Sequence, residues 1–278
     1  MEAVQETNLW GVQRISLGVP RRCCAWPLIR GLSDLPQIAV LQDCPAVIAR
    51  RFRDNEFDCA LLPVIEGLAR VGADATRESP AFKVIPGIGI STEGDCVTEV
   101  LFARGALSET QRVVADFAQG GMLAFAQVLL AEHCPRPPEF VDASDRAATD
   151  PVDGVLLSGD DAFAEANPFP LRYDLGELWR QLTDLPLVHM VWVARRGTPL
   201  GELRRLLALA LQKGLDELDQ IAATVSRAYD ISLDTALEYL KGTVRYRIGA
   251  AEMDGIRKFT ELAAKHGLCD PQSEIHLC

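Results

Sequence analysis

The sequence predicts an α/β protein with two lobes joined by a hinge around a cleft. Apolar runs of strand length alternate with amphipathic segments along most of the chain, which is typical of α/β sheets. In addition, segments 99–105 and 190–197 are buried strands that both close in Ala-Arg and a Gly. We therefore expect the chain to leave one lobe along the first strand and to return along the second. The predicted lobes are 1–98 with 196–278, and 99–195.

The first part of the chain alternates predicted strands with predicted helices. Pro27 and Pro45 suit the first turn of a helix, where the missing N–H has no helical partner to lose, and Asp43 or Cys44 is placed to cap the second helix. The predicted strands are 15–19, 38–41, 58–62 and 84–90, the last interrupted by Pro86-Gly87. This order predicts a parallel sheet with ligand-facing loops at the carboxyl ends of its strands.

The second lobe repeats the order of strand, helix and strand. Gly120-Gly121 is predicted to open a helix, which the proline-rich run 134–138 breaks. The predicted strands are 112–115, 140–141, 154–157 and 188–193. Residues 173–176 (Tyr-Asp-Leu-Gly) are turn-prone, and we expect them to brace the hinge ahead of a short amphipathic helix. Neither lobe carries a GxGxxG or GxxxxGK[ST] sequence, so a dinucleotide or P-loop site has no support.

After Gly197 the pattern becomes helical. Apolar residues keep helical spacing from 203 to 225, Ser232 is placed to cap a further helix, and a last helix is predicted from about 250 to Gly267. We expect these helices to cover the first lobe.

The amino-acid composition argues against some classes of binding partner. The chain of 278 residues has a formal net charge of −11, which argues against nucleic-acid and membrane-surface partners, since both favour basic proteins. The eight cysteines form no CxxC pair and several lie in apolar runs, so we expect reduced core thiols and no metal site. The N-terminal stretch 1–14 lacks the features of a secretory signal, and we expect a cytoplasmic protein.

Four segments together resemble one enzyme family. They are Asp-Cys-Ala-Leu-Leu-Pro-Val-Ile-Glu at 58–66, Pro-Gly-Ile-Gly-Ile-Ser-Thr-Glu-Gly at 86–94, Val-Leu-Leu-Ser-Gly-Asp at 155–160, and Tyr-Asp-Leu-Gly through Val-Trp-x-x-Arg at 173–195. In this order they are similar to the chorismate dehydratases of the futalosine route to menaquinone. The resemblance runs from about residue 15 to residue 267. It implies a type II periplasmic-binding-protein fold, with the ligand cleft between the lobes and no metal or organic cofactor.

The first loop departs from the pattern of that family. The first loop of the family is similar to Ser-Tyr-Leu-Asn-Thr-x-Pro-Leu, whereas this chain has Arg21-Arg22-Cys23-Cys24-Ala25-Trp26-Pro27-Leu28. Cys24 therefore stands at the Asn position and Ala25 at the Thr position. Arg21 and Arg22 are candidates to bind the two carboxylates of chorismate; a solvated basic pair is the alternative. Cys24 is a candidate substrate contact or an ordinary buried thiol.

Further candidate substrate-binding residues follow other predicted strands. They are Ser91, Thr92, Gln119, Gly120, Gly121 and Asp160. The bare N–H groups of Gly120 and Gly121 are suited to an anion although the family's hydroxyls are missing there. Asp160 is a cleft residue or a helix cap. We interpret Glu66 as a first-turn helix residue and His189 as a core histidine, so no catalytic residue is assigned.

The expected function is that of a hydro-lyase, which converts chorismate to 3-[(1-carboxyvinyl)oxy]benzoate in menaquinone biosynthesis. The alternative is a non-catalytic or repurposed protein that binds a small carboxylate on the same scaffold. A transport receptor is a third possibility, weakened by the missing signal. The expected partner is a small anionic substrate, with the protein as a monomer or homodimer.

Overall fold

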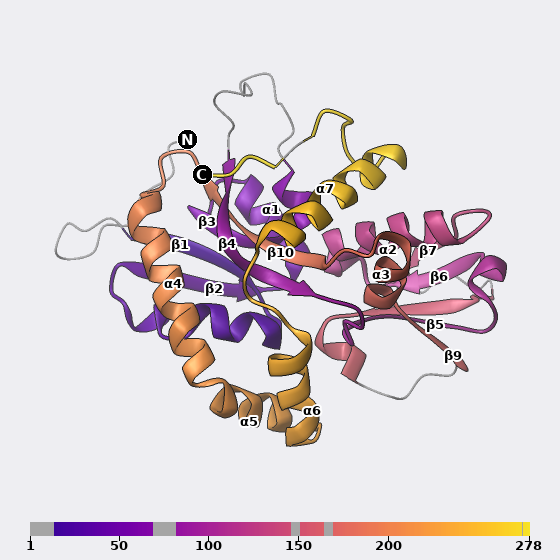
Figure 1. Cartoon of the computed structure of the whole chain (residues 1–278), viewed down its shortest axis with the longest axis horizontal. Coiled ribbons are helices and arrows are strands. Elements are labelled where there is room, and N and C mark those ends of the chain that lie inside the picture. Colours follow the sequence, from indigo (N-terminus) through magenta and orange to yellow (C-terminus); the bar gives the residue numbers. More distant parts are fainter. Residues whose placement is uncertain (1–13, 69–81, 146–150, 164–168, 274) are drawn as a thin grey trace.

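Two lobes, each built on a five-stranded sheet, make up the fold (Figure 1). The computed structural model describes residues 14–68, 82–145, 151–163, 169–273 and 275–278. The two-lobed α/β architecture predicted from the sequence is thereby confirmed. Residues 1–13, which carried most of the argument about a secretory signal, lie outside the described residues.

The first sheet has the strand order β2-β1-β3-β10-β4. Its strands are β1 (Ile15–Pro20), β2 (Ile38–Asp43), β3 (Cys59–Pro63), β4 (Phe82–Thr92) and β10 (Leu187–Arg195). β1 pairs in parallel with β2 and β3, whereas β10 runs antiparallel to both β3 and β4. The sheet is therefore mixed, and the prediction of a parallel sheet was wrong for its second half. The cause is the return from the other lobe, which brings β10 into this sheet in the reverse direction.

The second sheet has the strand order β7-β6-β8-β5-β9. Its strands are β5 (Glu99–Ala103), β6 (Arg112–Ala115), β7 (Glu139–Asp142), β8 (Gly154–Ser158) and β9 (Leu171–Asp174). β6 is parallel to β7 and β8, and β5 is antiparallel to β8 and β9. The pattern of parallel and antiparallel neighbours is the same as in the first sheet.

This correspondence explains the two similar strands noticed in the sequence. β5 and β10 are each fourth in the order of their sheet, and each is the first strand that the chain forms after it crosses between lobes. Both are buried from both sides, which accounts for their continuous apolar character. The strand expected to close the second lobe, 190–197, thus lies largely in the first sheet. We propose that the boundary on the return falls between 175 and 186 rather than at 195.

Helices cover both faces of the first sheet. Along β10, Trp192 packs in one hydrophobic core and its neighbour Val193 in another, as alternation across a strand requires. α4 (Leu200–Asp216), α5 (Leu218–Tyr229) and α6 (Leu233–Leu237) cover the first face, as expected for the C-terminal helices. The second core extends into the other lobe and takes in α1 (Pro45–Arg53), α2 (Gly121–His133), α3 (Leu175–Thr183) and α7 (Ala250–Lys265).

Short helical turns fill the connections. The 3₁₀ segments are η1 (Cys23–Ile29), η2 (Leu32–Asp34), η3 (Val64–Gly67), η4 (Leu107–Glu109), η5 (Phe117–Gln119) and η6 (Asp160–Phe163), and η7 (Glu238–Thr243) is a π-helical turn. The helix predicted to begin at Pro27 is instead η1, which begins at Cys23. The helical pattern from 203 to 225 is divided at Glu217 into α4 and α5.

The chain crosses between the lobes twice, outward between β4 and β5 and back between β9 and β10. The side chain of Asp174 joins these two crossings. Its carboxylate accepts hydrogen bonds from the N–H groups of Cys96 and Val97 on the outward crossing, each at 2.9 Å. The same carboxylate caps α3 on the return crossing by accepting from the N–H groups of Gly176 and Glu177 at 2.9 and 3.3 Å. The turn predicted at 173–176 is thus the end of β9 and the first turn of α3. One side chain fixes both crossings, at the place predicted to brace the hinge.

Close approach at the crossings also explains the glycine of the Tyr-Asp-Leu-Gly sequence. A Cβ atom at Gly176 would lie 2.2 Å from the carbonyl oxygen of Gly94 and 2.9 Å from Cβ of Cys96. On the same crossing Val97 has a φ of 66°, which is strained for a β-branched residue. Its N–H is held by Asp174 and by Asp95.

We expect the change Asp174→Ala to lower the free energy of unfolding by ~3 kcal/mol or more, because buried N–H groups on both crossings lose their acceptor. Asp174→Asn, which keeps one carbonyl oxygen, is expected to cost less. Urea denaturation of the three proteins measures both effects. A loss below ~1 kcal/mol for the alanine variant would show that Asp174 does not hold the crossings together.

Candidate functional site between the lobes

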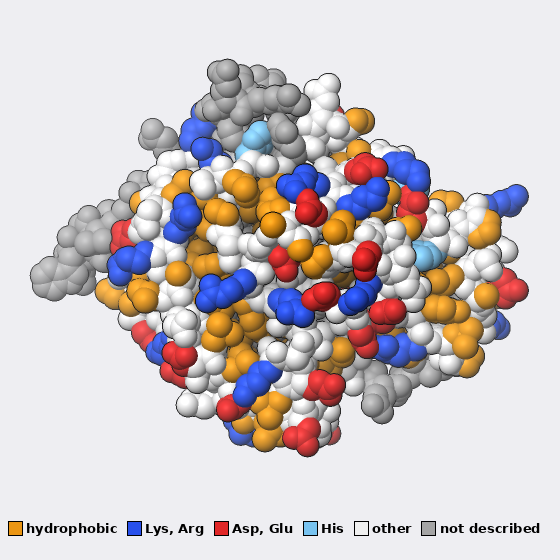
Figure 2. Space-filling view, in the orientation of Figure 1, with side chains coloured by type: hydrophobic (Ala, Val, Ile, Leu, Met, Phe, Trp, Pro, Cys, Tyr) orange, Lys and Arg blue, Asp and Glu red, His pale blue; other side chains and the backbone are white. Residues whose placement is uncertain are grey.

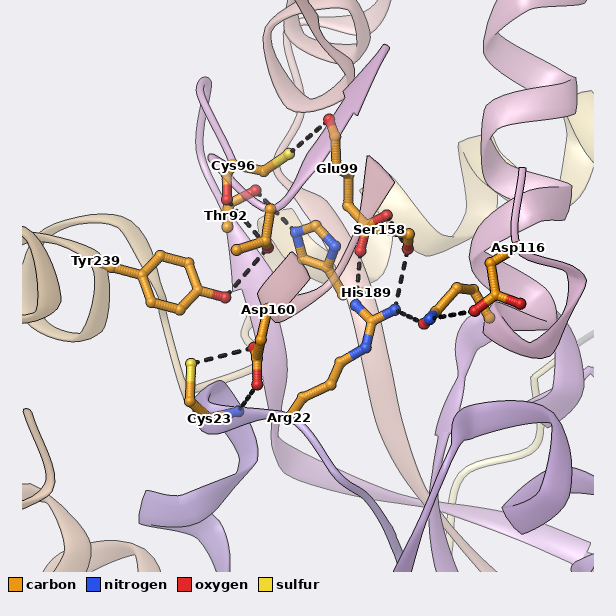
Figure 3. Close-up of polar contacts among 12 residues, drawn as sticks. Arg22, Cys23, Thr92, Cys96, Glu99, Asp116, Ser158, Asp160, His189 and Tyr239 are labelled. Carbon is orange, nitrogen blue, oxygen red and sulfur yellow. Dashed lines mark hydrogen bonds and ion pairs between the residues drawn. The ribbon is translucent and has the colours of Figure 1, made fainter. Parts of the chain in front are cut away.

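The contact between the lobes is centred on the side chain of Arg22. Arg22 follows β1 in the first lobe, and only 5% of it is exposed. Its Nη1 donates to Oε1 of Glu99 at 2.7 Å, and its Nη2 donates to Oε1 of Gln119 at 2.7 Å and to Oγ of Ser158 at 3.0 Å (Figure 3). All three acceptors belong to the second lobe. A single guanidinium therefore joins the first strand of one lobe to three elements of the other.

Arg22 and Glu99 form a buried ion pair. Burial raises the pKa of Glu99, although the Arg22 guanidinium and the Ser158 hydroxyl act in the opposite direction. For Arg22, burial acts most strongly and lowers the pKa, but the charge and hydrogen bond of Glu99 together with Cys24 and Asp160 outweigh it, and the pKa is raised. Taking two charges out of water costs free energy that their attraction only partly offsets. The pair is therefore not a large source of stability.

Two neighbours fix the guanidinium in place. Oε1 of Gln119 accepts a hydrogen bond from Arg22, and Nε2 of Gln119 donates one to Asp116 at 3.0 Å. These two bonds define the orientation of the Gln119 amide. Gly159, with a φ of 82°, lies so close that a Cβ atom there would be 3.0 Å from Cζ of Arg22. Arg22 Nε is buried without a hydrogen-bond partner in the structure, so the guanidinium keeps donor capacity for a further acceptor.

Asp160 makes the second polar contact between the lobes. Its carboxylate accepts from the N–H of Cys23 at 2.8 Å, from Sγ of Cys23 at 3.2 Å, and from the hydroxyl of Tyr229 on α5. Burial and Asp160 raise the pKa of the Cys23 thiol, which is therefore protonated. Asp160, the first residue of η6, thus binds two elements of the first lobe, η1 and α5.

Hydroxyl groups and an imidazole line the inner end of the cleft. Oγ1 of Thr98 lies 3.2 Å from the hydroxyl of Tyr239, and Oγ1 of Thr92 lies 3.0 Å from Nε2 of His189 (Figure 3). Burial, and next the charge of Arg22, lower the pKa of His189 to about 3. The imidazole is therefore neutral. Burial raises the pKa of Cys24 to about 12, so this thiol is protonated as well.

Two cavities lie along the cleft, and Arg22 lines both. The inner cavity has about 10 Å³ and is also lined by Cys24, Thr92, Glu99 and His189. The outer cavity has about 200 Å³, with Arg21, Gln119 and Asp160 in its wall. Both are smaller than the ~300 Å³ at the lower end of small-molecule sites. Neither cavity has room for a ligand of that size with the lobes in this arrangement.

A larger hollow of about 890 Å³ lies elsewhere, between η1 and helices α4 and α5. Its charged groups include Arg30, Lys213 and Glu217, and Arg30 is paired with Glu217 on the surface at 2.5 Å. If volume were the only criterion, this hollow would be the candidate site. We assign the site to the cleft instead, because buried ionisable and polar side chains from both lobes converge there.

The structure brings together most of the residues predicted from the sequence. Arg21, Arg22, Gln119 and Asp160 line the outer cavity, and Cys24 and Thr92 line the inner one with Arg22. Arg21 differs from Arg22 in being exposed, with one contact to the carbonyl of Gln42 at 3.4 Å. Glu66 pairs with Arg53 outside the cleft, in accordance with its interpretation as a helix residue. His189 is buried, as expected of a core histidine, and it also lines the inner cavity.

The remaining predicted residues line neither of these cavities. Ala25 and Ser91 are fully buried, and Oγ of Ser91 has no hydrogen-bond partner in the structure. The N–H of Gly120 donates to the carbonyl of Phe117 at 3.1 Å, so it is not available to an anion in this conformation. A Cβ at Gly121 would lie 2.6 Å from Cβ of Pro63 at the end of β3 and 2.7 Å from Ile65 of η3, so this glycine allows α2 to pack against both.

Sequence reasoning missed Glu99, Ser158, Tyr229 and Tyr239. Glu99 carried a usable signal, because it is a charged residue at the start of an otherwise apolar strand. Ser158 lies within the segment 155–160, of which only Asp160 was predicted as a site residue. The two tyrosines lie on C-terminal helices, and no local pattern connects them with a cleft formed by distant segments.

Three further properties of the described residues concern possible partners: the surface charge, the length and polarity of the helices, and the grouping of potential metal ligands. On the face seen in Figure 2, Lys and Arg side chains lie among Asp and Glu side chains rather than in one basic area. Within the described part of the chain, every helix is too short or too polar to cross a bilayer. The same residues contain no cluster of three or more potential metal ligands.

Comparison with known proteins places the chain in a family. The model of the family described as menaquinone biosynthesis matches residues 15–265. The chain belongs to the menaquinone biosynthesis family. It is also 27% identical over 263 residues to the chorismate dehydratase of Thermus thermophilus, a match that covers 88% of this chain and 93% of that protein.

Solved structures confirm that this member of the menaquinone biosynthesis family has a periplasmic-binding-protein-like fold. A protein of Archaeoglobus fulgidus superimposes with a TM-score of 0.68 at 14% identity, covering 92% of this chain and 98% of that one. The periplasmic aliphatic sulphonate binding protein of Escherichia coli gives 0.58 at 13% identity, covering 94% and 90%. A Candida albicans protein, described as having the generic periplasmic binding protein fold, gives 0.57 at 11% identity, covering 92% and 91%. At these identities the likeness concerns the fold alone.

We expect Asp160→Ala to lower the free energy of unfolding by about 2 kcal/mol and to loosen the contact between the lobes, because Cys23 and Tyr229 lose their shared acceptor. Asp161→Ala, at the exposed neighbouring position, is the matched control. Urea denaturation and the radius of gyration from small-angle scattering measure the two effects. If both variants match the unchanged protein, Asp160 does not join the lobes.

Proposed function

We propose that this protein is a chorismate dehydratase, which binds chorismate between its lobes and converts it to 3-[(1-carboxyvinyl)oxy]benzoate. The observation that carries the proposal is the position of Arg22. It is a buried cation at the junction of the two lobes, in a chain that is similar to a chorismate dehydratase over 88% of its length. A dicarboxylate substrate needs cationic partners, and Arg21 lies beside Arg22 in the same cavity wall.

The proposed reaction is a loss of water that leaves an aromatic ring. The ring carbon bearing the enolpyruvyl ether loses its proton, and the neighbouring carbon loses its hydroxyl group, which departs with a proton as water. No electrons are gained or lost overall, so the reaction needs no oxidant or reductant. Because aromatisation supplies much of the driving force, the protein has chiefly to position the substrate and to manage the proton.

The nearby side chains favour the substrate's own side-chain carboxylate as the acceptor of the ring proton. His189 is a weak base, since its pKa is lowered to about 3. Asp160 is engaged by Cys23 and Tyr229. In this proposal Arg21 and Arg22 hold the substrate so that its side-chain carboxylate lies over the ring carbon. Solving a complex in which that carboxylate points away from the ring would exclude this route.

A second candidate is a protein that binds a small carboxylate without turning it over. The first loop favours it, because Cys24 and Ala25 stand at the Asn and Thr positions of the chorismate dehydratase pattern. Cys24 lines the inner cavity and is 4% exposed, and Ala25 is fully buried, so neither supplies the hydrogen-bonding side chain that the pattern has there. Turnover decides between the two candidates.

The decisive experiment is incubation of the purified protein with chorismate, with the benzoate product followed by chromatography and mass spectrometry. We expect turnover, and we expect Arg22→Met to lower kcat/KM by at least about tenfold because a charge-assisted contact is lost. Arg21→Ala should have a smaller effect that shrinks further at high salt, since Arg21 is exposed. Arg30→Met, in the remote hollow, is the control.

Binding of chorismate without any product would favour the second candidate. Equal turnover by the Arg22 and Arg30 variants would show that the substrate carboxylate does not bind at Arg22.

A further inference from the structure

We propose that Glu99 occupies, on Arg22, the place that the ligand's carboxylate takes in the complex. Glu99 is then an internal competitor that sets which ligands the cleft accepts: only a carboxylate able to displace it binds. The inference deepens the proposed function and rests on it for the location of the ligand. It concerns binding alone, so it can fail or hold independently of turnover.

The geometry makes Glu99 separable from Arg22. Arg22 belongs to the first lobe, and Glu99 is the first residue of β5, directly after the outward crossing into the second lobe. Their 2.7 Å contact therefore spans the cleft and is broken whenever the lobes part. The pair forms again when they close on an empty cleft. A carboxylate that enters while the lobes are apart meets a guanidinium without its usual partner.

Glu99 supplies the charged acceptor of Nη1 on Arg22, and a ligand carboxylate at Nη1 would need the same place. The other two acceptors of Arg22, Gln119 Oε1 and Ser158 Oγ, are neutral. The cavity beside the pair has about 10 Å³, which is too small for a ligand carboxylate next to that of Glu99. On the Nη1 side of the guanidinium, which faces this inner cavity, binding of a ligand carboxylate and pairing with Glu99 therefore exclude one another.

Displacement has a consequence for the charge of Glu99. Once Arg22 turns to the ligand, Glu99 stays buried with the Ser158 hydroxyl and without its cation, so burial favours the protonated form. The other ionisable groups that line the same cavity or act on Glu99 are neutral or negative: Cys24 of η1, Cys96 before β5, Asp174 of β9, His189 of β10 and Tyr239 of η7. No second cation among them replaces Arg22. Ligand binding should therefore take up a proton and become tighter as the pH falls.

The test uses benzoate as a probe, because it supplies one carboxylate on a six-membered ring. Isothermal titration calorimetry compares the unchanged protein with Glu99→Gln and Glu132→Gln. Glu132 is the matched control, since it pairs α2 with Lys265 and His266 at the end of α7 and has no contact with Arg22. The change Glu132→Gln weakens the contact between α2 and α7 but leaves the pair of Arg22 and Glu99 intact.

We expect Glu99→Gln to bind benzoate at least about tenfold more tightly than the unchanged protein, and Glu132→Gln to stay within about threefold. Titrations in buffers of different ionisation enthalpy should show proton uptake by the unchanged protein and none by Glu99→Gln. Equal affinities, an equal gain in the control variant, or no binding of benzoate to either the unchanged protein or Glu99→Gln would overturn the inference.

A second measurement applies even if Glu99→Gln folds poorly. In Glu99→Ala the guanidinium lacks its carboxylate, so added acetate should raise the melting temperature by occupying the same place. The double variant Arg22→Met with Glu99→Ala has no cation there and should show no such rise. A response to acetate that is the same in both variants would overturn the inference. Chorismate turnover does not enter either measurement, so a failure of the proposed reaction is recognised separately.

Discussion

The buried ion pair between Arg22 and Glu99 is the interaction on which the arrangement of the lobes depends. It brings the loop after the first strand of one lobe against the first strand of the other, and Gln119 and Ser158 gather around the same guanidinium. Two charges buried in this way are expensive in free energy. Their presence at the centre of the cleft is reasonable if one of them serves a ligand, and the size of the surrounding cavities is consistent with a cleft that has closed on its own side chains.

The crossings between the lobes complement this contact. Asp174 gathers N–H groups from both crossings, and Gly176 allows them to lie against each other. The lobes are thus held at the crossings, and separable polar contacts at Arg22, Asp160 and Glu132 join them elsewhere. The second core limits how far the lobes can part, because the rings of Phe125 on α2 and Phe259 on α7 pack at a tilt with their centroids 5.7 Å apart. A motion that opens the cleft has to slide these helices past each other.

The fold could be predicted from the sequence because its signals are local. Apolar runs marked β1, β3 and β10, and the repeated ending of 99–105 and 190–197 marked equivalent strands. The direction of β10 and its sheet could not be predicted, since pairing depends on residues distant in the chain. For the site, Arg22 and Asp160 were found because they follow strands. Tyr229 and Tyr239 were not, because only tertiary packing brings C-terminal helices to the cleft.

A crystal structure of the protein in complex with 3-[(1-carboxyvinyl)oxy]benzoate tests the central claim most directly. We expect a ligand carboxylate within hydrogen-bond distance of the Arg22 guanidinium, with Glu99 no longer paired to it. An intact contact between Arg22 and Glu99, with the ligand bound elsewhere (for example in the hollow between η1 and α4), would contradict the account.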